Sequence, residues 1–323
     1  SLWVLKKGRG KEKTMEISLL LMQQIAQLFL ILIMGYAVVK AGLLKASDSR
    51  VLSVVMVYLV TPCVIINAFQ IDDTPEIRKG LLYSMAIAAV HVVLLVLSAL
   101  LSRPLKLDAV EQVNVIYSNA AALVIPLVKA LMGDAYVIYS CAFIIVQLVL
   151  LWTHASSLLQ GSSALDWKKV LTNINMIAIA AGALLYWFRV VLPAPLQNTM
   201  STVGNMMGPM GMLLAGMAIA EKPLREVFCT RRNYLPTVLR LVVCPLVVLV
   251  LLWVCHASSW VADGKNILMT VYLAAITPAC ATVTSMAQLY DRDAAHSSAL
   301  YVLTTLLSIV SMPVMIGLFD LLL

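Results

Sequence analysis

The chain has 323 residues; 62% of them are hydrophobic, only 12% are charged, and the mean hydropathy is +0.94. About a quarter of the residues in an average soluble domain are charged, so this composition excludes an ordinary water-soluble protein and predicts a membrane protein. The net charge of +7 comes mainly from the N-terminus and short connections, which favours a membrane-orientation signal over nucleic-acid binding.

The predicted elements begin after a basic N-terminal stretch. Residues 1–14 lack the apolar core of a signal peptide and precede Met15, so they are expected to be a leader or a non-native extension. From Met15 onward, apolar runs of roughly 20 residues predict transmembrane helices. The ten predicted spans are 17–39, 51–70, 80–101, 111–132, 135–158, 171–191, 199–220, 235–255, 267–288 and 296–322. The expected fold class is therefore an all-α membrane protein with ten transmembrane helices and short connections.

The ten spans divide into two halves of five, residues 15–160 and 171–323, on either side of a linker at 161–170. An odd number of spans in each half turns the second half upside down relative to the first. Such inverted repeats are typical of secondary transporters, whose binding sites form where interrupted helices meet near the membrane midplane.

Lysine and arginine in the connections predict the orientation of the spans. With residues 1–14 left aside, twelve such residues fall on one side of the membrane and five on the other. Since positively charged loops tend to stay in the cytoplasm, we expect both termini outside and the linker inside.

Glycine and proline recur at one spacing in the two halves. Gly35 lies 27 residues before Pro62, and Gly182 lies 27 residues before Pro209. In each half the glycine belongs to the first span and the proline to the second. This recurrence is a second indication of an internal repeat.

The fourth span of each half also carries a proline, Pro126 in the first half and Pro278 in the second. Proline suits the first turn of a helix, where its missing N–H would have no partner. If each span breaks before its proline, two half-helices begin near the midplane and point their positive ends at one another. Such a pair would bind an anion without a buried lysine or arginine. The alternative reading is that each proline only kinks its helix.

Polar residues flank both predicted breaks. Ser118 and Asn119 precede Pro126, and the amide of Asn119 can offer a donor and an acceptor to a carboxylate. Thr277 and Thr282 flank the second break, where they can satisfy freed carbonyls or touch the substrate. An asparagine that only joins helices by hydrogen bonds is the alternative.

Three ionisable residues within the predicted spans are candidates for other roles. His91 in the third span and His154 in the fifth could carry a coupling proton, or could be neutral histidines bonded to neighbouring helices. Arg240, about five residues inside the eighth span, is interpreted as an interfacial anchor that reaches back to the cytoplasmic surface, with attraction of an anion as the alternative. The spans carry no strongly acidic cluster, but backbone carbonyls can also bind sodium, so proton and sodium both stay open as the coupling ion.

The segments "SNAAALVIPL", "AITPACATV", "GYAVVKAGLL" and "YLVTPCVIINAF", in this arrangement, resemble the auxin efflux carrier family over essentially the whole chain after Met15. The resemblance implies two broken helices that cross at Pro126 and Pro278, and an asparagine, here Asn119, that contacts the substrate. It also implies an elevator mechanism, in which spans 3–5 and 8–10 move against a scaffold of spans 1, 2, 6 and 7. A homodimer formed through the scaffold is expected on the same basis.

The chain departs from this family in two ways. Alanines, Leu123 and Val124 stand where many relatives have glycines between the asparagine and the proline, and the long hydrophilic loop of the plant members is absent. The chain thus resembles a compact bacterial member of the inner membrane that carries small organic acids rather than auxin.

The predicted function is secondary active transport of small organic anions, mono- or dicarboxylates, with a proton or sodium as the coupling ion. We expect no cofactor and no metal site, because the six cysteines have no paired spacing. Three alternatives stay open: a sodium-coupled symporter of a related 5+5 fold, a channel or receptor, and a membrane-embedded enzyme. The sequence carries no HExxH and no Gly-x-Ser-x-Gly, so no enzymatic activity is predicted.

Overall fold

The computed structural model describes residues 23, 26–27, 29–70, 74–161, 171–172, 174–220, 224–261 and 263–323. In these residues the regular structure is helical, apart from one isolated antiparallel bridge between Ser118 and Ala279. The predicted all-α class is confirmed. The predicted leader 1–14 and nearly all of the linker lie outside the described residues.

Six helices of the described part are long and apolar enough to cross a membrane. They are Ala46–Ala68, Pro75–Leu105, Ala135–Gln160, Ala194–Ile219, Arg231–Val254 and Ala294–Leu322. In the first half their segments are η1 Ala46–Asp48, α2 Ser49–Val55, η2 Met56–Val60, α3 Thr61–Ala68, α4 Pro75–Ala88, α5 Val90–Leu105, α8 Asp134–Leu150, η4 Leu151–Ala155 and α9 Ser156–Gln160. In the second half they are α12 Ala194–Gly204, α13 Met207–Ile219, α15 Arg231–Val238, η5 Leu239–Val243, α16 Cys244–Val254 and α19 Ala294–Leu322; α14 Leu224–Cys229 and η6 Ala257–Ser259 are short connections.

The other four predicted spans are shorter or interrupted in the described residues. The first is described as the helix Phe29–Lys40, and the sixth as α11 Ile174–Trp187. The fourth consists of α6 Ala109–Ile116, η3 Ala120–Val124 and α7 Ile125–Met132, and the ninth of α17 Gly264–Ile276 and α18 Ala281–Leu289. A count of ten crossings therefore stays a prediction.

Widened π-helical turns precede three of the prolines. The turns η2, η3 and η5 end at Val60, Val124 and Val243, each two residues before a proline. A proline inside a helix lacks an N–H donor and its ring crowds the carbonyl four residues earlier, and a π-turn is one way to absorb this disturbance. The helix of the fourth span thus resumes at Ala120, so the predicted start at Pro126 is wrong.

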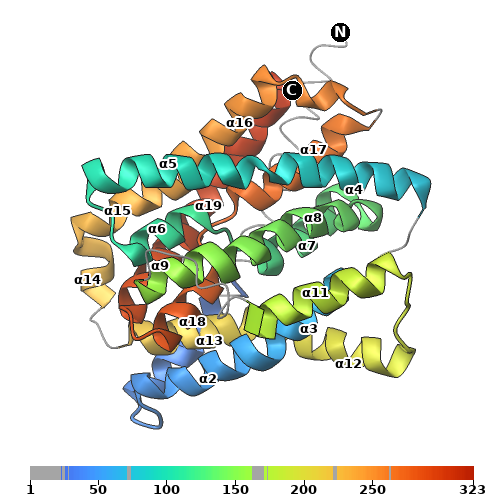
Figure 1. The fold of residues 1–323 in the computed structure, drawn as a ribbon. Coiled ribbons are helices and arrows are strands. Elements are labelled where there is room, and N and C mark those ends of the chain that lie inside the picture. The colour runs from blue at the N-terminus through green and yellow to red at the C-terminus, as the bar shows by residue number, and fades with distance from the viewer. Residues whose placement is uncertain are drawn as a thin grey trace.

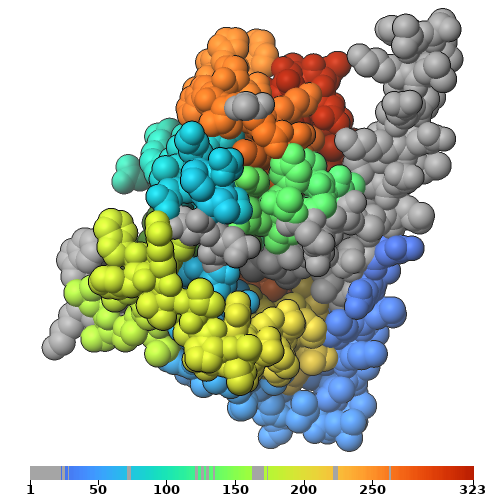
Figure 2. Space-filling model, turned by 90° about the vertical axis from the view of Figure 1, so that its right-hand side faces the viewer, coloured from blue at the N-terminus to red at the C-terminus, as the bar shows by residue number. Residues whose placement is uncertain are grey.

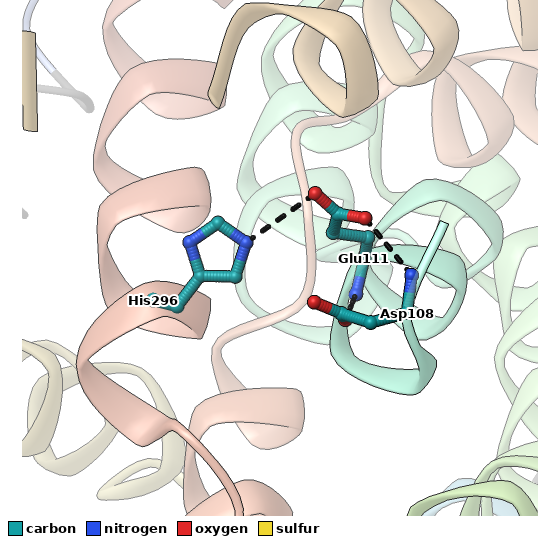
Figure 3. A group of neighbouring side chains, drawn as sticks. All are labelled: Asp108, Glu111 and His296. Carbon is teal, nitrogen blue, oxygen red and sulfur yellow. Dashed lines mark hydrogen bonds and ion pairs between the residues drawn. The ribbon is translucent and has the colours of Figure 1, made fainter. Parts of the chain in front are cut away.

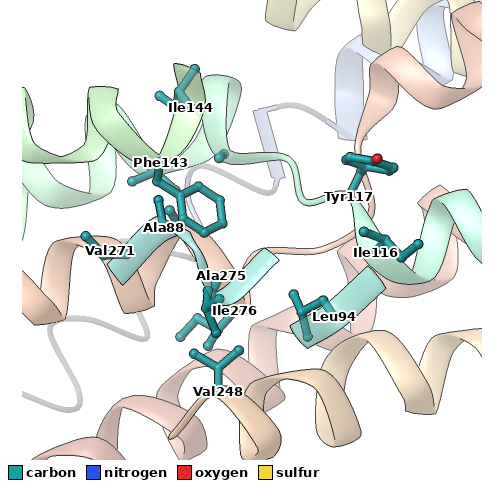
Figure 4. Close-up of a cluster of buried hydrophobic side chains, with 14 of the residues drawn as sticks. Ala88, Leu94, Ile116, Tyr117, Phe143, Ile144, Val248, Val271, Ala275 and Ile276 are labelled. Carbon is teal, nitrogen blue, oxygen red and sulfur yellow. The ribbon is translucent and has the colours of Figure 1, made fainter. Parts of the chain in front are cut away.

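The helices form two groups that mix both halves of the chain. In Figure 1, α2, α3, α11, α12 and α13 lie together below, and α4, α5, α16 and α17 lie above. Figure 2 shows the same division on another face, with yellow and blue segments below orange, red and cyan ones. The largest buried apolar cluster lies mainly in the upper part and also reaches Val57, Ile65 and Ala178 of the lower part. Figure 4 shows some of its residues, including Ile116, Phe143, Val248 and Ile276.

Two hydrogen bonds to methionine sulphur join helices of the two halves and within the second half: α18 bonds to η2, and α19 bonds to α13. The Ser285 hydroxyl of α18 donates to Met56 Sδ at 3.3 Å, and the Tyr301 hydroxyl of α19 donates to Met212 Sδ at 2.8 Å. All four side chains are buried. We call this contact the methionine seam.

Glycines let the helix Phe29–Lys40 and α13 touch backbone to backbone. A Cβ atom added at Gly216 would lie 2.0 Å from the Leu32 carbonyl oxygen, and one at Gly35 would lie 2.3 Å from that of Leu213. Neither oxygen can rotate away, because both belong to helical backbone. The two helices therefore form one closely packed pair.

Replacing Gly216 with alanine should lower the free energy of unfolding by about 1–3 kcal/mol, because the new methyl group must push the two helices apart. Thermal unfolding of the purified protein in detergent measures the effect. Gly317→Ala is the matched control, since no atom lies within 4 Å of its added Cβ and alanine favours the helix. Equal stability of the two variants would contradict the close contact.

Candidate functional site

Two extended segments cross in the interior of the molecule. Asn119 N donates to Pro278 O at 2.8 Å, and Cys280 N donates to Tyr117 O at 3.1 Å, which makes a short antiparallel bridge. The bridge joins the interruption of the fourth span to that of the ninth. Of the two prolines predicted to mark the crossing, only Pro278 lies in it; Pro126 belongs to α7, and its predicted place at the crossing is wrong because the π-turn η3 carries the helix past it.

Side chains from the next helix along the chain complete the hydrogen bonds of each segment. Gln147 of α8 donates through Nε2 to Ser118 O at 2.8 Å, and its Oε1 accepts from Ser118 N at 3.0 Å and from Ser118 Oγ at 2.7 Å. In the second half, the Thr304 hydroxyl of α19 accepts from Ala279 N at 3.1 Å. The Gln147 side chain thus bonds to the N–H and the C=O of Ser118, as a neighbouring strand would. The sequence did not predict this contact, because the two residues lie on different predicted spans.

The side-chain amide of Asn119 is the unsatisfied group of the crossing. Asn119 is only 4% exposed, and its Nδ2 has no hydrogen-bond partner among the described residues. A buried donor without an acceptor costs about 1–3 kcal/mol. Such a group in a native site calls for an explanation, and a bound acceptor is one.

Two helices begin beside the crossing. η3 starts at Ala120, directly after Asn119, and α18 starts at Ala281, directly after Cys280. The first N–H groups of a helix have no partner within it, and the helix dipole makes this end positive. Together with the Asn119 amide, the crossing thus presents donors and positive ends, which favour an anion.

The remaining predicted site residues lie at or near the crossing, with different roles. Thr277 is buried within it, and its hydroxyl donates to Ala274 O at 3.0 Å, at the end of α17. Thr282 is buried in the first turn of α18. The Ser118 hydroxyl is engaged by Gln147. Among the side chains whose contacts are described, Asn119 is the one that keeps a free donor at the crossing.

Arg240 does not reach the membrane surface. It lies in η5 and is only 1% exposed. Its Nη1 donates to Val115 O at 3.2 Å and Ile116 O at 3.0 Å, and its Nη2 donates to Ala275 O at 2.5 Å and Thr277 O at 2.8 Å. Nε donates to Thr277 O as well, at 3.0 Å. The interpretation as an interfacial anchor is wrong, because the carbonyls freed by two interrupted helices offer this side chain five bonds in the interior.

The two histidines have different relations to the crossing. His154 Nδ1 lies 3.0 Å from the hydroxyl of Tyr117, which also donates to Leu150 O. His91 is fully buried; its Nδ1 lies 2.9 Å from Ala88 O, and its Nε2 has no partner among the described residues. His154 therefore bonds to a residue of the crossing, while His91 keeps one ring nitrogen free.

An ion-paired cluster caps the start of α6 (Figure 3). Asp108 and Glu111 form a reciprocal capping box, and Arg232 of α15 donates to both Glu111 carboxylate oxygens at 2.6 and 2.5 Å. His296 Nε2 lies 3.6 Å from the same carboxylate. Asp108, Glu111 and His296 are close enough together to suggest a metal site. The guanidinium already occupies the Glu111 oxygens, so we assign the cluster to joining α6, α15 and α19.

A family model described as membrane transport protein matches the chain over residues 20–165 and 162–316. These stretches contain both segments of the crossing and the residues that bond to them. No curated protein matches the sequence.

Proposed function

We propose that this chain, which belongs to the membrane transport protein family, is a secondary active transporter of small organic anions. Its predicted resemblance to the auxin efflux carriers points to the same kind of protein. The observation that carries the proposal is the buried, unpartnered Nδ2 of Asn119 beside two helix N-termini. A carboxylate is acceptor-only and negatively charged, and so suits both the donor and the positive helix ends. Mono- and dicarboxylates are the proposed substrates.

The two helix groups support an elevator movement between a scaffold and a mobile unit. The helix Phe29–Lys40 packs on α13, and α11 packs on α3, so the first helix of each half contacts the second helix of the other. Such reciprocal contacts between the two halves are what an inverted 5+5 repeat would produce. We propose that these helices and α2 and α12 form the scaffold and the dimer interface, while α4–α9 and α15–α19 carry the crossing across the membrane.

The membrane in which the protein lies and the side of its termini are also proposed. The chain is a multi-pass membrane protein, and we propose the bacterial inner membrane with both termini outside. Alternating access would bring the crossing to one side of the membrane and then to the other. A proton or sodium gradient would supply the energy.

The test is transport in proteoliposomes loaded with the purified protein. Lactate, malonate, malate and succinate are added in turn while charge movement and internal pH are recorded. A current, or a pH change without current, for at least one acid is the expected result, since electroneutral proton symport moves no net charge. Absence of a current, of a pH change and of accumulated acid for all four acids, under a proton gradient and under a sodium gradient, would contradict the proposed function.

A proton role for His91 predicts that His91→Gln flattens the pH dependence of uptake. Glutamine cannot pick up a proton, so the uptake rate should depend less on pH in this variant than in wild type. Wild-type uptake should fall as the pH rises. His256→Gln, at an exposed histidine, is the control. An unchanged pH profile in His91→Gln would exclude His91 as the proton carrier. His154→Gln would then be tested in the same way.

A further inference from the structure

The crossing holds negative helix ends as well as positive ones. α6 ends at Ile116 and α17 ends at Ile276, so their C-terminal carbonyls meet at the place where η3 and α18 begin. A helix end carries roughly half an elementary charge, negative at the C-terminus and positive at the N-terminus. Left alone, the two C-terminal ends would cancel the attraction that the two N-terminal ends exert on an anion.

Arg240 bonds to both of the negative ends. Each nitrogen of its guanidinium donates to at least one carbonyl, two carbonyls belonging to the end of α6 and two to the end of α17 and its continuation. Its single positive charge matches the roughly −1 carried by two helix C-termini. In the part of the chain that the structure describes, Arg240 has no ion-pair partner, whereas Glu111, the other deeply buried charged residue, is paired with Arg232.

We infer that Arg240 is a positioning residue that holds the crossing together and neutralises its two helix C-termini, so that the site selects anions over neutral molecules of the same shape. This inference rests on the proposed function. Arg240 acts through the helix ends and not by touching the substrate, because its donors are already engaged. A shell of carbonyls without this charge would instead favour a cation.

The holding role is tested without any transport. Arg240→Gln keeps an amide donor but loses the charge and most of the bonds, and Arg240→Lys keeps the charge. Arg103→Gln, at an exposed arginine of α5, is the matched control. Amide hydrogen exchange by mass spectrometry is followed in residues 117–119 and 277–280. Exchange there should rise by about tenfold or more in Arg240→Gln, less in Arg240→Lys, and not in the control.

The charge role is tested by selectivity. Uptake of the acid that wild type transports best among the four is compared with uptake of its amide, for example lactate with lactamide or malonate with malonamide, in the same proteoliposomes. Wild type should prefer the acid over its amide. The preference should fall by about tenfold in Arg240→Gln and persist in Arg240→Lys, even if both variants are slow. A purely structural role would lower acid and amide uptake together and leave their ratio unchanged.

The outcomes separate this inference from the proposed function. Uptake of none of the four acids by wild type would overturn the proposed function and with it the selectivity claim, while hydrogen exchange would still decide the holding role. An acid preference that is equal in wild type and Arg240→Gln would overturn the charge role. Unchanged exchange at both segments in Arg240→Gln would overturn the holding role.

Discussion

Asn119→Ala is expected to lower organic-anion transport by roughly 10- to 150-fold, the value of one hydrogen bond of about 1.5–3 kcal/mol to a charged group. Its thermal stability should be unchanged or slightly raised. The reason is that Nδ2 has no partner among the described residues, so the substitution removes a buried unsatisfied donor and breaks no side-chain bond made by that nitrogen. Loss of function without loss of stability is the signature of a group reserved for a substrate.

The measurement is initial uptake of the acid that gives the largest signal, with thermal unfolding of the same preparation. Asn205→Ala, at the exposed asparagine that follows α12 as its C-cap, is the control and should transport like wild type. Asn119→Asp should be at least as inactive as Asn119→Ala, because a carboxylate there would repel an anion. Wild-type uptake in Asn119→Ala would remove this residue from the mechanism.

Gln147→Leu is expected to reduce transport by more than tenfold, because it disturbs the backbone of the crossing. The substitution removes three hydrogen bonds to Ser118 and leaves a buried N–H and a buried carbonyl without that partner. Unpaired groups of this kind cost about 1–3 kcal/mol each, so the extended segment should lose its fixed geometry. Unlike Asn119→Ala, this variant should also be less stable in thermal unfolding.

Gln147→Glu gives a sharper test of the same contact. A protonated carboxyl can both donate to Ser118 O and accept from Ser118 N, whereas an ionised carboxylate can only accept. Transport by Gln147→Glu should therefore recover as the pH is lowered and fall as it is raised, more steeply than in wild type. Gln160→Leu in α9 is the control for loss of an amide. Equal activity of Gln147→Leu and wild type would contradict the role assigned to Gln147.

The membrane character and the region where the two interrupted spans cross could be predicted from the sequence because both depend on local composition. Apolar runs long enough to span a membrane can be read directly from the sequence. Asn119 stands out in such a run because a side-chain amide in the membrane interior needs hydrogen-bond partners. The position of the interruption could not be predicted in this way. Pro126 appeared to begin a half-helix, but a π-turn accommodates it, and nothing in the sequence distinguishes a proline that starts a helix from one that follows such a turn.

The partners of the crossing depend on contacts between distant helices. Arg240 is 37 residues from Thr277 and 124 from Ile116, and Gln147 is 29 from Ser118. Depth in the membrane can be counted along a span, but the direction in which a side chain points depends on how helices pack. Depth alone suggested that Arg240 reaches for the surface, whereas the freed carbonyls of two helices keep it in the interior.

The methionine seam bears on how easily the scaffold and the mobile unit could move past each other in the proposed elevator movement. A thioether is a weak acceptor on a flexible side chain, so breaking the bonds of Ser285 to Met56 and of Tyr301 to Met212 gives up little energy. The released serine hydroxyl can turn back to a carbonyl of its own helix. In the proposed elevator movement these two bonds would add little to the activation barrier. The stronger bond to break between α19 and α13 would be that of the Ser298 hydroxyl, which donates to Ala215 O at 2.6 Å.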